Sequence, residues 1–289
     1  MDYILFYKGK IPKYLNKCVN SILSVDSSSK IYFLTDQKIT SSIENFEIVD
    51  INTLKGNSSS KITDLDYFKG DNNPLWETSL IRLFYIYDFV QSYDIKSFVH
   101  FDADVLIYKP FQDLVHLMAT DKINITPLTS DFLVFGYSYF PNPALLSSLI
   151  NKFYDILKDS KSYENRYYEG NRLNEMKMLH IANIEIPSLF NLLNVLPISN
   201  SNLVFDPGSY GQYIGGTHNK KFSKKFIDLN HLVGMEIHLD KIKPKKVNTN
   251  FIIKNESNFD KELVNLHVHS KNLKKYLPSE YIEKVRNLK

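Results

Sequence analysis

A hydrophobic segment that runs directly into two aspartates constrains this chain more than any other feature. Residues 98–107 read Phe-Val-His-Phe-Asp-Ala-Asp-Val-Leu-Ile, so Asp102 and Asp104 follow a stretch typical of a buried strand. In open α/β sheets, ligands bind outside the carboxyl ends of the strands. Two carboxylates there repel each other unless water or a cation separates them, and Mg²⁺ and Mn²⁺ prefer carboxylate oxygens. The segment therefore predicts a metal site, with an ordinary acidic turn as the alternative.

Predicted strands and helices alternate along the first half of the chain, which favours an α/β fold with a doubly wound sheet. Apolar runs predict strands at residues 3–7, 31–34, 46–51, 97–101, 105–108, 123–125, 132–135 and 264–269. Helical periodicity predicts helices at residues 12–23, 76–91, 143–157, 173–181 and 278–288. Cys18 falls on the apolar side of the first helix, so we expect it in the core.

Composition excludes several classes of protein. The 289 residues contain one cysteine, which rules out an intramolecular disulfide framework and a multi-cysteine zinc site. A formal net charge of +3 does not indicate a nucleic-acid partner. No apolar run reaches the roughly 18 residues of a membrane span, and the first residues do not form a signal peptide. We therefore expect a cytoplasmic protein.

The charge is unevenly distributed. Residues 220–289 carry a net charge of +8, whereas residues 1–219 carry −5. Solubility explains such a surplus of lysines most simply. The alternative is a surface for a phosphorylated ligand or for peripheral contact with the anionic inner face of a membrane.

A late strand pattern places two histidines on one face. If residues 264–269 form a strand, Asn265, His267 and His269 share a face, and Lys271 follows just beyond. Imidazoles at a strand end can ligate a metal or contact a phosphate. A core position is the simpler interpretation of His267, whereas His269 is the better candidate for a ligand.

Two further segments carry polar groups in unusual settings. Residues 205–217 hold four glycines with Gln212 between them, which suggests either a polar binding wall or a tight turn; dinucleotide and Walker fingerprints are absent from this segment. Arg82 lies within an apolar helical pattern. A buried arginine needs an anionic partner, which a carboxylate or a diphosphate would supply.

Together these segments resemble a glycosyltransferase of the GT-A fold. The resemblance rests on the strand at 3–7, the helix at 12–23, the segment 31–36, the helix with Arg82, the Asp102-Ala103-Asp104 motif, and His269 with Lys271. It implies a single α/β domain over residues 1–289 with a Rossmann-like mixed sheet flanked by helices. Residues 1–110 would form the nucleotide-sugar-binding half, 111–275 the acceptor-binding half with the metal-binding histidine, and 276–289 a C-terminal helix.

The resemblance also implies a function. Such an enzyme moves a sugar from a nucleoside-diphosphate sugar, here a UDP- or GDP-sugar, to a hydroxyl of a glycan or glycoconjugate acceptor. Mn²⁺ or Mg²⁺ would bind at Asp102 and Asp104 together with His269 or His267. The remaining donor contacts would come from Tyr7, Asp36, Arg82, Asp102, Gln212 and Lys271.

Acceptor-side roles are also expectations from the resemblance. An inverting enzyme needs a general base for the acceptor hydroxyl, and the candidates are Glu175, Asp131 and Asp206. Tyrosine faces can stack on sugars while their hydroxyls form hydrogen bonds. The tyrosines considered for the acceptor are Tyr167, Tyr168, Tyr210 and Tyr213.

Two alternatives stay open. A haloacid-dehalogenase-type phosphatase also places Asp-x-Asp after a hydrophobic strand and would use Asp102 as a covalent nucleophile. That motif normally lies near the N-terminus, whereas about a hundred residues of α/β pattern precede it here, and no convincing late acidic pair follows. The second alternative is a non-catalytic sugar- or nucleotide-binding module, because fold alone does not define function.

Overall fold

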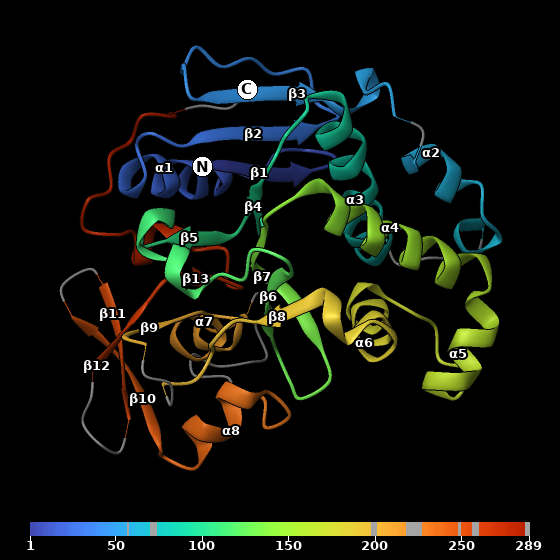
Figure 1. Ribbon diagram of the computed structural model, residues 1–289. Helices are drawn as coiled ribbons and strands as arrows, with labels where there is room; N and C mark the ends of the chain where they lie inside the picture. The colour runs from blue at the N-terminus through green and yellow to red at the C-terminus, as the bar shows by residue number, and fades with distance from the viewer. Residues whose placement is uncertain are drawn as a thin grey trace.

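A seven-stranded mixed sheet lies at the centre of the computed structural model (Figure 1), which describes residues 1–56, 58–69, 74–197, 201–217, 227–247, 250–255 and 260–286. The strand order is β3-β2-β1-β4-β7-β6-β8. The bounds are β1 (Asp2–Tyr7), β2 (Lys30–Thr35), β3 (Phe46–Asp50), β4 (Phe98–His100), β6 (Ile123–Pro127), β7 (Leu133–Phe140) and β8 (Phe190–Leu192). The predicted α/β class is confirmed.

The four strands at one side of the sheet run parallel, and the other three make it mixed. β1 pairs in parallel with β2 and with β4, and β2 pairs in parallel with β3. β7 is antiparallel to both β4 and β6. Because helices cover both faces of the parallel part, its strands are buried on both sides and read as continuous apolar runs.

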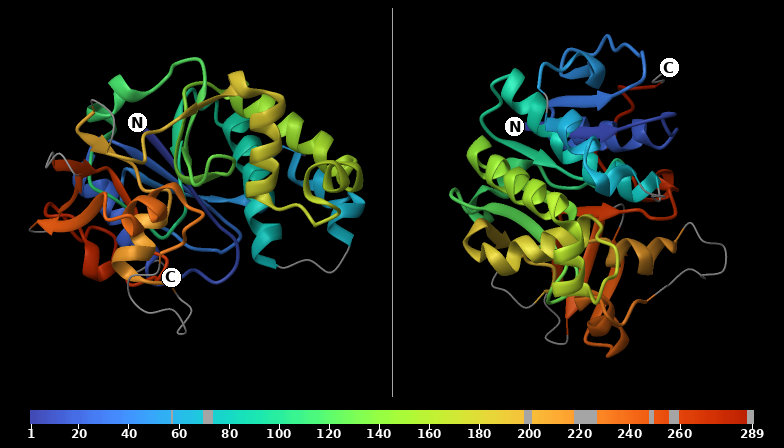
Figure 2. Two further views of the ribbon diagram at one scale, coloured as in Figure 1. Left: turned by 90° about the horizontal axis from the view of Figure 1, so that it is seen from below. Right: turned by 90° about the vertical axis from the view of Figure 1, so that its right-hand side faces the viewer.

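Helices cover the two faces unequally. α1 (Leu15–Val25) packs on one face through a buried stripe that contains Cys18, as expected. On the other face lie α3 (Pro74–Ser92), α4 (Pro143–Lys158) and α6 (Glu175–Glu185), which share one apolar cluster (Figure 2). Asn142 caps α4 by accepting a hydrogen bond from the N–H of Leu145. The helices predicted at these positions are confirmed.

The C-terminal third adds a second sheet that the sequence did not reveal. It has the order β10-β11-β12-β9, and a separate two-stranded ladder joins β5 to β13. The bounds are β5 (Val105–Ile107), β9 (Leu203–Val204), β10 (Ile242–Val247), β11 (Asn250–Asn255), β12 (Asp260–Leu263) and β13 (Asn265–His267). β9 has two residues and β10 carries three lysines, so neither shows a clear strand pattern.

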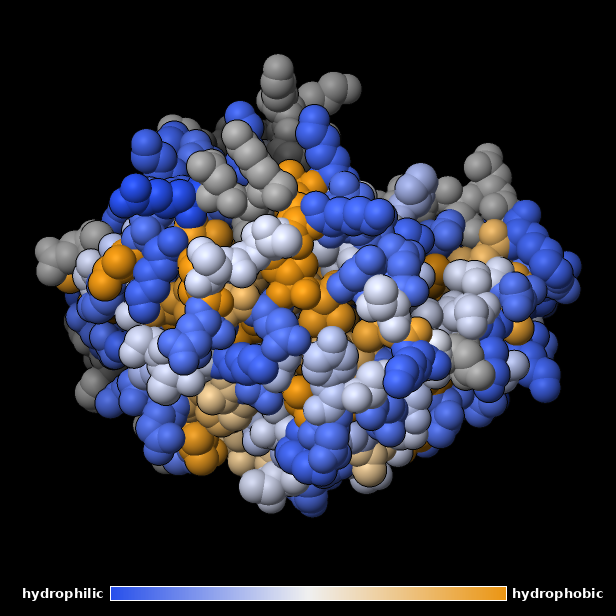
Figure 3. Space-filling view, turned by 90° about the horizontal axis from the view of Figure 1, so that it is seen from above, coloured by the Kyte–Doolittle hydropathy of each residue, from blue (hydrophilic) through white to orange (hydrophobic). Residues whose placement is uncertain are grey.

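Shorter elements complete the chain. The remaining α-helices are α2 (Ser58–Thr63), α5 (Ser160–Tyr168), α7 (Ser209–Gly215) and α8 (Leu232–His238). Short 3₁₀ turns are η1 (Ile51–Thr53), η2 (Asp66–Lys69), η3 (Phe111–Asp113), η4 (Val115–Leu117), η5 (Pro187–Leu189) and η6 (Leu273–Tyr276). Among the described helices, none combines the length and apolarity that a membrane span requires. The face shown in Figure 3 is mostly polar, with apolar side chains in patches between the polar ones.

The predicted C-terminal helix at residues 278–288 is wrong. Residues 278–286 contain no helix, and the last three residues lie outside the described part of the chain. The side chain of Asn20 in α1 accepts hydrogen bonds from the N–H groups of Lys284 and Val285 and donates one to the Val285 carbonyl. The backbone of this segment therefore bonds to α1, because a buried asparagine offers partners that a helix would otherwise supply internally.

Candidate functional site

The end of β4 places two carboxylates at the carboxyl edge of the sheet. Phe101 and Ala103 belong to the apolar core, and Asp102 and Asp104 alternate with them in the segment after β4. A turn closed by the Val105 N–H and the Asp102 carbonyl (3.1 Å) then leads into β5. Asp104 is 4% exposed, and the side chain of Asp102 is 32% exposed. One carboxylate is thus enclosed, and the other faces solvent.

β13 brings a histidine to these carboxylates. It pairs antiparallel with β5, so that His267 lies opposite Val105. His267 Nε2 is 3.1 Å from Asp104 Oδ1 and 3.7 Å from Asp102 Oδ2. One ligand atom from each of the three residues falls within 4.8 Å of the others. The structure therefore selects His267, which the sequence pattern placed in the core, as the imidazole that faces the acids.

His269 lies behind His267. The two imidazole rings stack with centroids 4.2 Å apart and an interplanar angle of 18°. Burial and, to a lesser degree, the nearby His267 together lower the pKa of His269 to about 3, so this ring is neutral. His269 supports the ring of His267, and its role as a metal ligand stays a prediction.

Two cations hold the carboxylates in their ionised form. Arg82 forms an ion pair with Asp102, and Lys271 forms one with Asp104. Although burial acts to raise it, His267 and Lys271 hold the pKa of Asp104 well below its usual range. Burial likewise opposes a charged imidazole, but the two aspartates raise the pKa of His267 above its ordinary value. The predicted positive charge of Lys271 is therefore placed at the acidic motif.

The donor set fits a divalent cation. Two ionised carboxylates and an imidazole are ligands that Mn²⁺ accepts, and the converging cations show that this position favours positive charge. A metal must displace the proton of His267 and the ammonium of Lys271, so its binding would be linked to pH.

Arg82 links the acidic motif to α6. Its guanidinium contacts Asp102 on one side and Glu175 Oε1 on the other at 2.7 Å. Glu175 begins α6 directly after the cap Asn174 and is 7% exposed. Burial raises the pKa of Glu175 to about 7, against the opposing effect of Arg82. Of the two kinds of partner that the sequence left open for Arg82, the structure shows carboxylates, and there are two of them; its predicted contact with the donor stays a prediction.

Tyr7 and Asp36 lie at the carboxyl ends of neighbouring strands. Tyr7 ends β1, and Asp36 follows β2 and accepts a hydrogen bond from the N–H of Gly9 at 2.8 Å. Gly9 has φ +94°, a conformation that glycine adopts without strain. Tyr7 and Asp36 therefore lie at the same carboxyl edge of the sheet as Asp102, which comes after β4.

Tyr14 is a site residue that the sequence pattern did not indicate. It immediately precedes α1, and the Nζ of Lys271 lies 5.6 Å from the centre of its ring. Burial raises the pKa of Tyr14, and the charge of Asp104 raises it further. Pro12, two residues earlier, marks only a helix start, so no local signal pointed to this tyrosine.

The glycine-rich segment forms a helix start rather than an open loop. Asp206 is fully buried, and both of its oxygens accept hydrogen bonds from backbone N–H groups. This placement gives it no access to an acceptor hydroxyl. Gln212 lies on α7, where its Oε1 is buried without a hydrogen-bond partner among the described residues. Its predicted donor contact stays untested.

The predicted acceptor tyrosines fall in different places. Tyr210 is fully buried and donates to the Val195 carbonyl, so it belongs to the core. Tyr167 donates to Glu185 Oε1 at 2.6 Å, within an ion-pair cluster on α4–α6. Tyr213 is half-buried against the core. Of the four, Tyr168 is the tyrosine whose ring lies beside both Phe132 and His180.

Tyr168, Phe132 and His180 form an aromatic platform. The rings of Phe132 and Tyr168 are stacked with centroids 6.4 Å apart, and the Tyr168 hydroxyl lies 2.5 Å from His180 Nδ1. Asp131 is an exposed residue beside Phe132. Its negative charge acts to raise the pKa of Tyr168 and the pKa of His180, rather than acting on the metal ligands. Asp131 is therefore associated with the platform.

A serine, a histidine and an aspartate also converge near α7. Ser209 Oγ lies 3.0 Å from His231 Nδ1, and His231 Nε2 lies 3.5 Å from Asp228. A hydrolytic triad would also need free backbone donors for an oxyanion. The N–H groups of Gly208, Tyr210 and Gly211 are all bonded to Asp206, so this arrangement ties α7 to α8 instead.

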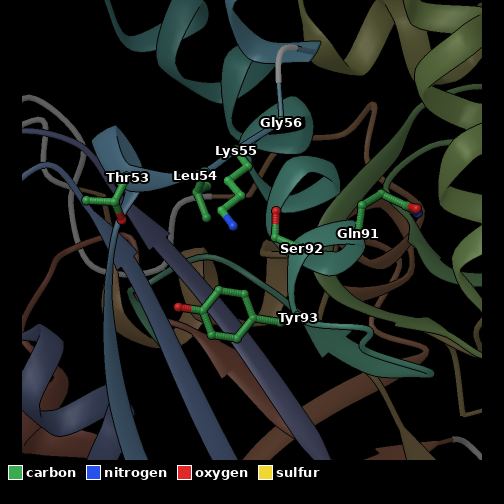
Figure 4. A pocket seen from close by; sticks show the side chains of 7 residues that line it. All are labelled: Thr53, Leu54, Lys55, Gly56, Gln91, Ser92 and Tyr93. Carbon is green, nitrogen blue, oxygen red and sulfur yellow. The ribbon is translucent and has the colours of Figure 1, made fainter.

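An open pocket of about 460 Å³ lies apart from the carboxylates (Figure 4). It lies between the segment after β3 and the end of α3, and the predicted site residues do not line it. The lining residues are Thr53, Leu54, Lys55, Gly56, Gln91, Ser92 and Tyr93.

No protein-family model and no curated protein matches the sequence. The chain is similar to solved structures that are glycosyltransferases of the GT-A type. For mouse xyloside xylosyltransferase 1, identity is 12%, coverage is 67% of this chain and 86% of that chain, and the TM-score is 0.48. For an active-site mutant of LgtC, identity is 13%, coverage is 76% of this chain and 80% of that chain, and the TM-score is 0.47. For GlyE of Streptococcus pneumoniae, identity is 14%, coverage is 66% of this chain and 44% of that chain, and the TM-score is 0.38.

Proposed function

We propose that this protein is a metal-dependent glycosyltransferase that moves a sugar from a nucleoside-diphosphate sugar to a hydroxyl of a glycan or other acceptor. The observation that supports this most is the cluster of Asp102, Asp104 and His267, with Arg82 and Lys271 beside it. Two kinds of side chain meet at the carboxyl edge of the sheet: carboxylates that would hold a divalent ion and cationic side chains that would hold phosphate oxygens.

The cluster suits a leaving group that develops negative charge. A divalent ion bound by Asp102, Asp104 and His267 would neutralise charge on a departing diphosphate as a Lewis acid. Lys271, whose side chain is 40% exposed, is positioned to release Asp104 and contact a phosphate oxygen. Arg82 is held by two carboxylates, so it orients Asp102. Tyr7 and Asp36 line the adjoining strand ends, where we place the nucleoside.

Glu175 is the acid best placed to act on the acceptor. It contacts Arg82, which contacts Asp102, and its Oε2 has no hydrogen-bond partner among the described residues. A carboxyl with a pKa near neutrality can accept a proton efficiently. Glu175 is therefore our candidate base, and Asp131 and Asp206 lie in places that suit the role less.

The platform of Phe132, Tyr168 and His180 is our candidate for acceptor binding. Aromatic faces stack on the apolar faces of sugars, and Asp131 could accept hydrogen bonds from their hydroxyls. α6 joins this platform to Glu175, because Glu175 and His180 lie on the same helix. Replacing Phe132 with alanine should raise the KM for the acceptor and spare hydrolysis of the donor by water.

The two alternatives have less support from the geometry. The imidazole that faces Asp102 and Asp104 takes the place of the further acidic residues that a phosphatase of the haloacid-dehalogenase type would need. Arg82 also pairs with Oδ1 of Asp102, the carboxylate that would have to act as the nucleophile of a phosphatase. A binding module without catalysis would explain the cluster but gives no role to the buried Glu175 beside it, whose pKa burial raises to about 7.

Thermal unfolding with a panel of UDP- and GDP-sugars tests the proposal. Binding to the native state raises the melting temperature by mass action, so one donor should give a shift that depends on Mn²⁺ or Mg²⁺. Donor hydrolysis, measured as released nucleoside diphosphate, should follow the same donor. Absence of both signals for every donor would refute the proposal.

Peripheral contact with an anionic membrane is a separate part of this proposal. Several C-terminal lysines are engaged in ion pairs, among them Lys241 with Glu236, Lys243 with Asp240 and Lys254 with Asp260. Lys245 on β10 is exposed and adds to the positive surface. At low salt, the protein should sediment with vesicles that contain phosphatidylserine. If it does not, the proposed membrane contact is contradicted.

A further inference from the structure

A buried aspartate outside the metal cluster holds the backbone of His267. Asp206 Oδ2 accepts hydrogen bonds from the N–H groups of His267 (2.9 Å) and Gly211 (3.0 Å). Asp206 Oδ1 accepts from Gly208 (2.7 Å) and Tyr210 (3.0 Å). Four donors on two oxygens satisfy a carboxylate fully. We call Asp206, Gly208, Tyr210 and Gly211 the Asp206 clamp.

Asn265 fastens the same strand to the clamp. Its Oδ1 accepts a hydrogen bond from the N–H of Asp206 at 3.0 Å, and its Nδ2 donates to the Asp206 carbonyl at 3.0 Å. Nδ2 also donates to the Gly136 carbonyl on β7 at 3.1 Å. Because Asn265 and Asp206 are both fully buried, a shift of β13 would leave several polar groups without partners.

Two glycines let the clamp approach the histidines closely. A Cβ at Gly211 would overlap the carbonyl oxygen of His267. A Cβ at Gly208 would lie 2.8 Å from His269 Nε2 and 3.5 Å from His267 Nδ1. Gly208 also has φ +120°, which side-chain-bearing residues rarely adopt. The rings of both histidines therefore rest directly on the backbone of the clamp.

We infer that Asp206 is a positioning residue for the metal site: through the clamp it fixes His267 so that Nε2 faces Asp102 and Asp104. This inference rests on the proposed function, because it assumes that His267 ligates the ion. Metal ligands must be held in place by surrounding hydrogen bonds, and loss of such partners typically weakens metal affinity about 10- to 100-fold. Here Asp206 bonds to the main-chain N–H of His267 rather than to its imidazole ring.

The test is the affinity of the purified protein for Mn²⁺, measured without donor by electron paramagnetic resonance of the free ion. Asp206→Asn replaces one acceptor oxygen with a donor that faces backbone N–H groups. It should weaken Mn²⁺ binding about 10- to 100-fold. Asp206→Glu, which keeps the charge, should lose less affinity. Wild-type affinity in Asp206→Asn would overturn the inference.

Asp88 provides a matched control. It is also a buried aspartate that accepts backbone N–H groups, those of Ser58 and Ser59, at the start of α2. Asp88→Asn should lower the melting temperature without changing Mn²⁺ affinity. An equal loss of affinity in both variants would show a general effect of destabilisation and overturn the inference.

Asp104→Asn separates this inference from the proposed function. If it leaves Mn²⁺ affinity unchanged, the ion does not bind at the cluster and both proposals fail. If Asp104→Asn abolishes binding while Asp206→Asn keeps the wild-type affinity, only the inference fails. If Asp206→Asn does not unfold cooperatively, Gly208→Ala is used in its place. This variant keeps the Asp206 carboxylate, and its added Cβ lies against the two imidazole rings. Gly208→Ala should also weaken Mn²⁺ binding, and unchanged affinity would overturn the inference.

Discussion

His267 Nε2 lies 3.1 Å from Asp104 Oδ1 because β13 pairs antiparallel with β5, the strand that begins directly after Asp104. The two residues are distant in the chain, and the ladder fixes their separation. Neither side chain forms the site alone, since the aspartate supplies charge and the imidazole supplies a nitrogen ligand. The consequences of this pairing can be measured.

Replacement of each histidine distinguishes the two imidazoles. His267→Ala should weaken Mn²⁺ binding at least about tenfold, since loss of a ligand costs no less than loss of a ligand's hydrogen-bond partner. His269→Ala keeps the ring that faces the acids and should cost much less. Titration calorimetry with Mn²⁺ checks both variants, and the reverse order of effects would show that His269 is the ligand.

Loss of Arg82 should destabilise the fold. Arg82→Met leaves the buried Glu175 and the neighbouring Asp102 without their counter-charge, so we expect a loss of about 3–5 kcal/mol in the free energy of unfolding. Urea denaturation measures it. Arg166→Ala is the control, because the side chain of Arg166 is 70% exposed and its ion pair with Glu185 is long; it should cost less than about 0.5 kcal/mol. Equal losses would contradict the buried bridge.

The stability of the protein should depend on the ionisation of Glu175. Its folded pKa of about 7 exceeds the ordinary value of 4.5, so the folded state keeps a proton that the unfolded state releases. This contribution is fully present below pH 4.5 and is lost as the pH rises through about 7. Glu175→Gln should therefore flatten the decline of the unfolding free energy in that range.

Glu185 gives a control of opposite sign for this pH dependence. Burial acts to raise its pKa, but hydrogen bonds from Lys152 and Tyr167 lower it below the ordinary value. Its contribution is present above the unfolded pKa and is lost as the pH falls. Urea denaturation of Glu185→Gln across the same range should show an unchanged decline toward pH 7. A wild-type profile for Glu175→Gln would contradict the raised pKa.

The terminal segment should detach when Asn20 is removed. Asn20→Ala breaks three hydrogen bonds to residues 284 and 285, of which two are buried and one is partly buried, each worth about 1 kcal/mol net, so we expect a loss of about 2–3 kcal/mol. Limited proteolysis should then cleave the segment faster. Asn16→Ala, which removes one exposed bond to Arg286, should leave the cleavage rate nearly unchanged. Equal rates in the wild type and Asn20→Ala would contradict this attachment.

Local patterns predicted the elements whose burial leaves a clear signature. The parallel strands and α1, α3, α4 and α6 agree with their apolar patterns, because a strand covered on both faces must be apolar throughout and a covering helix needs one apolar face. The short β9 and the lysine-bearing β10 lack such a signature. The residues of the C-terminal segment have helical periodicity, but Asn20 offers their backbone better partners.

The sequence by itself determined the acidic motif, because a buried strand that ends in Asp102 and Asp104 puts charge at the edge of a sheet whatever lies elsewhere. It also determined that Arg82 needs an anionic partner. Only the tertiary structure decided which histidine faces the acids, that Glu175 shares Arg82 with Asp102, and that the carboxylate of Asp206 accepts hydrogen bonds from backbone N–H groups. These relationships depend on strand register and on hydrogen bonds between distant segments, which side-chain periodicity does not encode.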